Sequence, residues 1–160
     1  MAPELLKAEL ACEALLACGA LRFRANGSSM LPGIRPGDVL LVHRRNICEV
    51  SAGEVAFYVC YGRLVAHRVI SHDGEFLIAQ GDSVPAPDPP IAVDDFLGVV
   101  VLIERGGRRI TPSRRLRPAA RMVAAVLSRS TFASKCLQRL YALFDQSRTD
   151  ARYAGLPETL

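Results

Sequence analysis

The chain has 160 residues, half of them hydrophobic, and a formal net charge of +4 at neutral pH. This length favours one domain with a single hydrophobic core. The longest uncharged stretch, residues 25–34, is much shorter than the roughly 18 to 20 apolar residues of a membrane-spanning helix. Charges within residues 4–13 also disfavour a signal peptide. We therefore expect a cytoplasmic protein without a transmembrane helix, and peripheral contact with a membrane stays open.

Basic residues are concentrated in the C-terminal part of the chain. Residues 105–148 contain eleven Arg and Lys and one acid, whereas residues 1–104 contain eight basic and thirteen acidic residues. Such an asymmetry favours an anionic surface as a partner of the basic part.

The cysteines and histidines predict neither a metal site nor another cofactor. The five cysteines form no Cys-x-x-Cys pair, and the three histidines have no ligand spacing relative to them. Cys48 and Cys60 fall in or beside apolar strand patterns, which favours reduced thiols in the core.

Residues 3–18 have the pattern of a helix. Pro3 suits the first turn, Glu4 suits the positive end of the helix dipole, and Gly19 can end the helix. We expect an apolar stripe to pack on the core or on a partner. The stripe consists of Leu5, Leu6, Leu10, Leu15 and Leu16.

A sharply turning segment follows, in which residues 26–38 read NGSSMLPGIRPGD. Its glycines permit unusual backbone angles and its prolines restrict φ, so Ser29 is expected on a rigid turn. Surface turns rich in Ser and Gly have the same composition, so this segment alone does not identify a site.

The middle of the chain predicts a mainly β, antiparallel domain, because short apolar or alternating runs are separated by turns without βαβ alternation. Residues 81–90 contain four prolines and are expected to be irregular. Strands are predicted at 21–24, 38–43, 55–60, 64–71, 76–79, 95–104 and near Ile110.

From residue 115 the hydrophobic period becomes helical, which predicts helices at about 116–128 and 131–145. The predicted organisation is an N-terminal helix (1–19), a β domain (20–112), a basic pair of helices (113–146) and a tail without regular structure (147–160).

Three stretches hold groups that could act together. Ser29 lies on the turn, His67 lies in the alternating strand VAHRVI (65–70), and the loop QGDSVPAPD (80–88) carries Asp82 and Asp88. A serine hydroxyl needs a neighbouring base, and an imidazole can take the proton and return it to a leaving amine. A carboxylate on the other ring nitrogen would orient the imidazole. A single His in a strand is more often a structural residue, so the sequence identifies these residues only as candidates for a catalytic triad.

The order of these three stretches resembles the catalytic core of the signal peptidase family, over roughly residues 21–104. The closer resemblance is to the endoplasmic-reticulum and archaeal type, in which His replaces the Lys of the common bacterial enzymes. It implies a LexA/signal-peptidase-like β fold, with residues 20–112 as the catalytic domain.

The resemblance implies Ser29, next to Met30, as the nucleophile and His67 as the base. It favours Asp88 as the acid that orients His67, although Asp82, otherwise a supporting residue of the loop, stays open as that acid. Ser28 is the rival nucleophile. Asp38 is expected to be structural, and His43 and His72 are expected to be exposed bystanders.

The resemblance also implies a peptide substrate that adds as a strand to a sheet edge, with small residues before the cut. Met30, Leu31 and Ile34 are the candidate apolar contacts. The N–H of Ser29 is the candidate oxyanion donor, and a second donor is unassigned. Gly27 stands where signal peptidases commonly have a Ser, and here the chain resembles the LexA-type repressors, which share the fold and rely on main-chain amides.

Three functions follow from these patterns. The first is a serine endopeptidase that cleaves a peptide or precursor protein. The second is a LexA-like regulator that cuts itself or a partner, although the 26 residues before Gly27 are too few for a helix-turn-helix domain, and the base is His instead of Lys. The third is a non-catalytic module whose residues 113–146 bind an anionic membrane surface, a partner protein or, as the least expected partner, nucleic acid.

Overall fold

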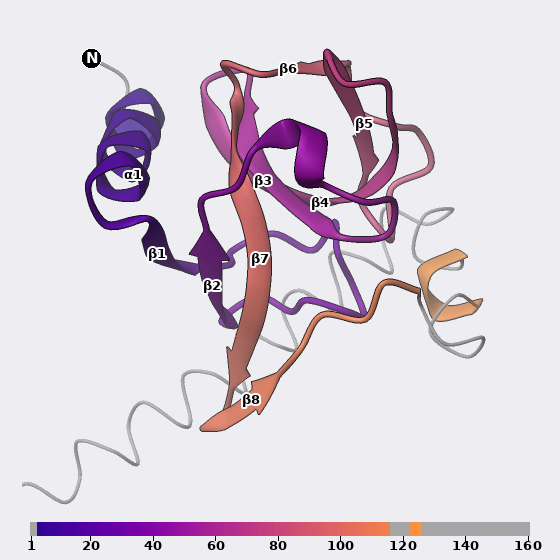
Figure 1. The fold of residues 1–160 in the computed structure, drawn as a ribbon. Coiled ribbons are helices and arrows are strands. Elements are labelled where there is room, and N and C mark those ends of the chain that lie inside the picture. The colour runs from indigo at the N-terminus through magenta and orange to yellow at the C-terminus, as the bar shows by residue number, and fades with distance from the viewer. Residues whose placement is uncertain (1–2, 116–121, 126–160) are drawn as a thin grey trace, which may run out of the picture.

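The computed structural model describes residues 3–115 and 122–125 (Figure 1). Within these residues one sheet of eight antiparallel strands is accompanied by an N-terminal helix, which confirms the prediction of a mainly β domain. In chain order the elements are α1 (Pro3–Cys18), β1 (Ala20–Arg24), β2 (Val39–His43), the 3-10 helix η1 (Ile47–Glu49), β3 (Val55–Cys60), β4 (Arg63–His72), β5 (Phe76–Gln80), β6 (Ile91–Ala92), β7 (Phe96–Arg105) and β8 (Arg108–Ile110).

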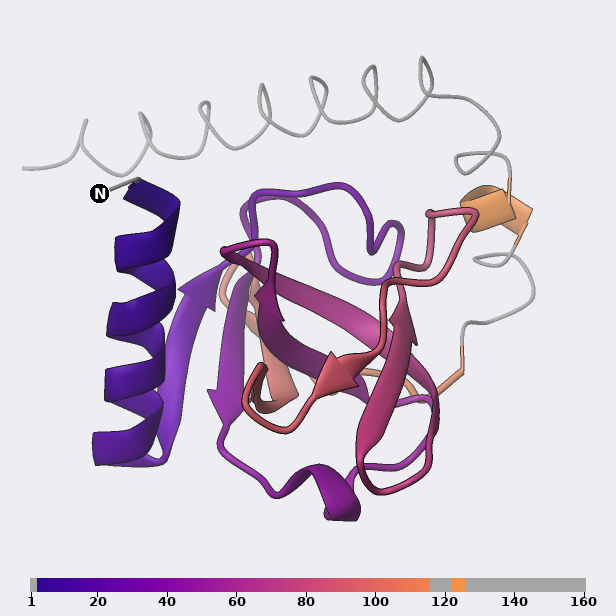
Figure 2. The same ribbon diagram turned by 90° about the horizontal axis from the view of Figure 1, so that it is seen from above.

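The long strand β7 lies inside the sheet, between β2 and β3. The strand order is β1-β2-β7-β3-β4-β5-β6, and β8 pairs with β7 as a hairpin. A Cβ atom at Gly98 would collide with the carbonyl oxygen of His43, so only glycine allows this approach between β7 and the end of β2. Register shifts between Leu41 and Val42 and between Phe57 and Tyr58 accompany the strong curvature of the sheet, which both views show (Figures 1 and 2).

The apolar side chains form two buried clusters, and β3 contributes to both. Phe57 belongs to the cluster that also contains Met30 and Ile34 of the serine turn. Tyr58 belongs to the other cluster, together with Val69 of β4. Because β3 is covered on both faces, its sequence VAFYVC is almost entirely apolar.

The helix α1 packs on the sheet through a face of small residues. Ala8, Ala11 and Leu15 are buried, and the helix contacts β1 and β4. The predicted leucine stripe is therefore wrong as the face that packs on the core, because only Leu15 of its five members is buried, and its packing on a partner stays a prediction. Alanines allow the helix to approach the strands closely and leave the larger leucines outside. The exposed leucines are Leu5, Leu6, Leu10 and Leu16.

The element boundaries otherwise agree with the sequence patterns within one or two residues, apart from η1 and the two-residue strand β6, which were not predicted. His43 and His72 are exposed, as expected. Cys48 is a correction: it lies on η1 and is exposed, because this short helix turns the position away from the core.

Most of the predicted C-terminal region lies outside the described residues. Residues 122–125, within the predicted helix 116–128, are helical, and the predicted helix 131–145, the tail and Cys136 fall beyond them. The partners predicted for residues 113–146 stay predictions. None of the helices that the structure describes is long and apolar enough to cross a membrane.

A buried ion pair ties the serine turn to the end of β7. Asp38, with a side chain only 3% exposed, accepts hydrogen bonds from Nε and Nη2 of Arg105 at 2.8 and 2.6 Å. The same guanidinium donates to the carbonyl oxygen of Gly33, and the backbone N–H of Arg35 donates to Asp38. Asp38 thus has the structural role that the sequence predicts.

We expect Arg105→Met to lower the free energy of unfolding by about 3 kcal/mol, because it leaves the carboxylate of Asp38 buried without its cation. Arg109→Met on the neighbouring strand is the matched control. The Arg109 side chain is 78% exposed and lies 3.8 Å from Glu104, so its removal is expected to change the free energy by less than about 0.5 kcal/mol. Urea unfolding measures both variants, and equal effects would contradict the structural role of the pair.

Candidate active site

Ser29, His67 and Asp88 form one continuous chain of hydrogen bonds. The Oγ atom of Ser29 lies 2.8 Å from Nε2 of His67, and Nδ1 of His67 lies 2.5 Å from Oδ2 of Asp88. The three residues come from the turn after β1, from the middle of β4 and from the loop after β5. His67 is buried, at 7% exposure.

The partners of His67 determine which ring nitrogen carries the proton in the neutral imidazole. An ionised carboxylate can only accept, so Nδ1–H donates to Asp88. The lone pair of Nε2 then faces the hydroxyl of Ser29, which donates to it. This arrangement allows the imidazole to remove the proton of the hydroxyl, and the carboxylate stabilises the imidazolium that results.

Tyr58 adds a contact that the sequence patterns did not predict. Its hydroxyl donates to Oδ2 of Asp88 at 2.6 Å and lies 3.3 Å from Nδ1 of His67. Its ring lies edge-on to the imidazole, with the ring centroids 6.3 Å apart. The available signal was a single hydroxyl in an otherwise apolar strand, because a buried Tyr usually requires a polar partner.

The loop after β5 is held against the serine turn by its backbone. Ser83 donates through its N–H to the carbonyl oxygen of Ser29 and through its hydroxyl to that of Ser28. Asp88 is fixed at the other end of the loop, where its N–H donates to the carbonyl oxygen of Ala79. These bonds bring the carboxylate to His67 although the loop has no regular structure.

Asp82 lies in the same loop but does not contact His67. It forms a two-pronged ion pair with Arg68, with distances of 2.7 and 2.9 Å. Arg68 also donates to the carbonyl oxygens of Gly53 and Ser113, so the pair joins the loop to the body of the domain. Of the two candidate acids, Asp88 is therefore the one placed to orient His67.

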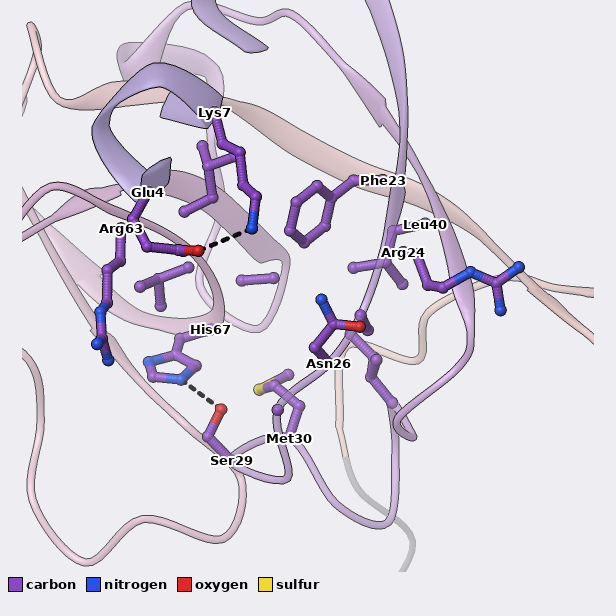
Figure 3. A pocket seen from close by; sticks show the side chains of 16 residues that line it. Glu4, Lys7, Phe23, Arg24, Asn26, Ser29, Met30, Leu40, Arg63 and His67 are labelled. Atoms are coloured by element: carbon purple, nitrogen blue, oxygen red, sulfur yellow. Dashed lines mark hydrogen bonds and ion pairs between the residues drawn. The ribbon is translucent and has the colours of Figure 1, made fainter. Parts of the chain in front are cut away.

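A cleft of about 770 Å³ opens beside Ser29 and His67 (Figure 3). One side is formed by β1 and the residues that follow it, and the other by β4, from Arg63 to His67. The first turns of α1 close one end, where Lys7 pairs with Glu4 at 2.7 Å. Met30 lies beside Ser29, and the charged side chains Glu4, Lys7 and Arg63 lie together near α1 (Figure 3).

The three candidate substrate contacts differ in their relation to this cleft. Met30 and Ile34 line it, although both side chains are largely buried. Leu31 is fully buried and is not among the lining residues, so the structure places it in the support of the turn. Gly27 also lines the cleft, and the oxyanion role of the Ser29 N–H stays a prediction.

The space around Gly81 gives a test of this packing. A Cβ atom there would lie 2.7 Å from the carbonyl oxygen of Ser29 and 3.1 Å from Nε2 of His67. We expect Gly81→Ala to lower the free energy of unfolding by about 1 to 3 kcal/mol and to displace the imidazole. Gly27→Ala is the control, because within the described part of the chain its Cβ would meet only Ser29 Oγ, at 3.9 Å. Urea unfolding and the imidazole NMR signals of His67 measure both effects, and equal behaviour of the two variants would contradict the described contacts.

Comparison with known proteins gives no family assignment. No protein-family model matches the chain, and no curated protein matches it. The chemistry of the site is therefore inferred from its own geometry.

Proposed function

We propose that this protein is a serine endopeptidase that cleaves a peptide or precursor protein, with Ser29 as nucleophile, His67 as general base and Asp88 as the orienting acid. The observation that carries the proposal is the hydrogen-bonded chain Ser29–His67–Asp88 beside an open cleft. Three polar residues that are distant in sequence meet here with the donor and acceptor order that nucleophilic catalysis requires.

The proposed reaction proceeds through an acyl-enzyme. Ser29 Oγ attacks the carbonyl carbon of the scissile bond while Nε2 of His67 takes the hydroxyl proton. The imidazolium, stabilised by Asp88, gives this proton to the leaving amine as the C–N bond breaks. A water molecule then attacks the ester, with His67 again accepting and returning a proton, and Ser29 is released.

The edge of β4 supports binding of an extended peptide. Among the residues that the structure describes, the pairing of β4 with β5 begins at Arg68, whereas Arg63 to His67 pair only with β3 and line the cleft. A peptide could therefore hydrogen-bond to this free backbone edge and reach Ser29 at its end. The charged side chains Glu4, Lys7 and Arg63 would contact the part of the peptide farthest from the reacting bond.

The resemblance to signal peptidases and LexA-type peptidases supports the same proposal. The serine turn, the His strand and the Gly-Asp loop follow one another along the chain in the order found in these families. The antiparallel sheet that carries them also agrees with the resemblance. In this proposal the fold is LexA/signal-peptidase-like.

Covalent labelling tests the nucleophile. We expect a fluorophosphonate probe to modify Ser29, and the modification to be lost in Ser29→Ala and slowed at least about 10³-fold in His67→Ala. Ser28→Ala is the matched control and is expected to react within about threefold of the wild-type rate. Peptide mapping by mass spectrometry locates the adduct. A folded wild-type protein that forms no adduct, or forms it on another serine, would refute the proposal, whereas fragments formed by the purified protein alone would indicate self-cleavage.

The two aspartates are expected to behave differently. Asp88→Asn should slow labelling by on the order of 10³- to 10⁴-fold with little loss of stability, because the amide no longer selects the reactive tautomer. Asp82→Asn should lower stability, because it weakens the buried pair with Arg68, and should leave the labelling rate of the folded protein within about tenfold. Labelling kinetics and thermal unfolding separate these effects, and the reverse pattern would assign the orienting role to Asp82.

A further inference from the structure

Tyr58 is a buried polar residue that the proposed reaction does not itself require. Its side chain is fully buried in an apolar cluster with Val69 and Ala79. A hydroxyl in such surroundings is costly unless it is hydrogen-bonded. The acceptor it finds is the carboxylate of Asp88, at 2.6 Å.

Two donors converge on the same oxygen of Asp88. Oδ2 accepts from the hydroxyl of Tyr58 and from Nδ1–H of His67, and the two donor atoms are 3.3 Å apart. Rotation of the carboxylate would break both hydrogen bonds together. Asp88 lies in an irregular, proline-rich loop. Its carboxylate is held in place by the hydroxyl of Tyr58, which belongs to the regular strand β3.

We propose that Tyr58 is a positioning residue, which holds Oδ2 of Asp88 on Nδ1 of His67 and reduces the negative charge that this oxygen presents to the imidazole. The proposal rests on the proposed peptidase function for its effect on rate, but not for its effect on the hydrogen bond. Strand β3 would then contribute Tyr58 as a fourth member of the hydrogen-bonded series Ser29–His67–Asp88.

The surroundings keep the hydroxyl of Tyr58 a donor at all working pH values. Burial, and then the hydrogen bond and charge of Asp88, raise the pKa of Tyr58 far above its usual range. Among the described residues, Cys60 and Ser29 also lie near the pair. Burial and the charges of Asp88 and Asp95 raise the pKa of Cys60, and Ser29 bonds to Nε2 of His67. Next to His67 along β4, Arg68 is paired with Asp82.

The first test observes the hydrogen bond itself. The Nδ1–H proton of His67 should give a separate low-field NMR signal in the wild-type protein at low temperature. Tyr58→Phe keeps the ring and removes the competing donor, so the signal should move further downfield. Tyr61→Phe is the matched control, because Tyr61 is 89% exposed in the turn between β3 and β4. A missing wild-type signal, or equal shifts in the two variants, would overturn the proposal.

Replacement of all four tyrosines by 3-fluorotyrosine provides a second variant that retains the hydroxyl. The fluorinated phenol is a stronger donor, so the signal should move upfield. The measurement therefore decides the question even if Tyr58→Phe does not fold, and an unmoved signal would count against the proposal.

The second test measures reactivity. Tyr58→Phe should slow fluorophosphonate labelling about tenfold to 100-fold, as expected for the loss of a hydrogen bond to a charged group. The acidic limb of the pH–rate profile should move to higher pH. Without the hydrogen bond from Tyr58, the carboxylate of Asp88 presents more negative charge to His67 and favours its protonated form. In the Asp88→Asn background the same change should cost less than threefold, because Tyr58 acts through Asp88.

The outcomes distinguish this inference from the proposed function. If neither the wild type nor Tyr61→Phe is labelled, the peptidase proposal fails, while the NMR signal still tests the position of Tyr58. If the wild type is labelled but Tyr58→Phe has the same rate, pH profile and signal, only the inference on Tyr58 fails. Additive effects of Tyr58→Phe and Asp88→Asn would also overturn it.

Discussion

The site depends on two irregular segments being held against each other. The serine turn and the loop after β5 are joined where Ser83 donates to the backbone carbonyls of Ser28 and Ser29. Gly81 makes this contact possible, because any side chain there would collide with the turn and with His67. Without these hydrogen bonds the hydroxyl of Ser29 and the carboxylate of Asp88 would have no fixed positions on the two sides of the imidazole.

Buried ion pairs anchor both segments to the sheet. Arg105 binds Asp38 at the end of the serine turn, and Arg68 binds Asp82 at the start of the loop. In each pair the aspartate side chain is 3% exposed, and the guanidinium also donates to backbone carbonyls. Such pairs add little net stability compared with apolar packing, but they favour one geometry, because any other leaves a buried charge without a partner.

One side of the candidate site is formed by the buried Tyr58 and the other side opens on the cleft. Tyr58 and Asp88 bond to each other next to an apolar cluster, where hydrogen bonds are strong and unpaired groups are costly. Ser29 lies on the cleft, where a substrate could reach it. His67 lies between the two sides, so one imidazole faces a fixed carboxylate and a reachable hydroxyl at once.

The sequence by itself determined the longer strands and the helix α1, because alternation and turn residues are local signals. The order of three stretches along the chain nominated Ser29 and His67, with Asp88 or Asp82 as the acid. It could not decide between Asp88 and Asp82, since both acids lie in one irregular loop and only the folded path of that loop turns one toward His67 and the other toward Arg68. It also did not indicate Tyr58 or the packing face of α1. A strand buried on both faces shows no alternation, and a helix face of alanines is hidden beside more hydrophobic leucines. Those features were decided by tertiary structure, because they depend on which surfaces meet and on which buried polar atoms then find partners.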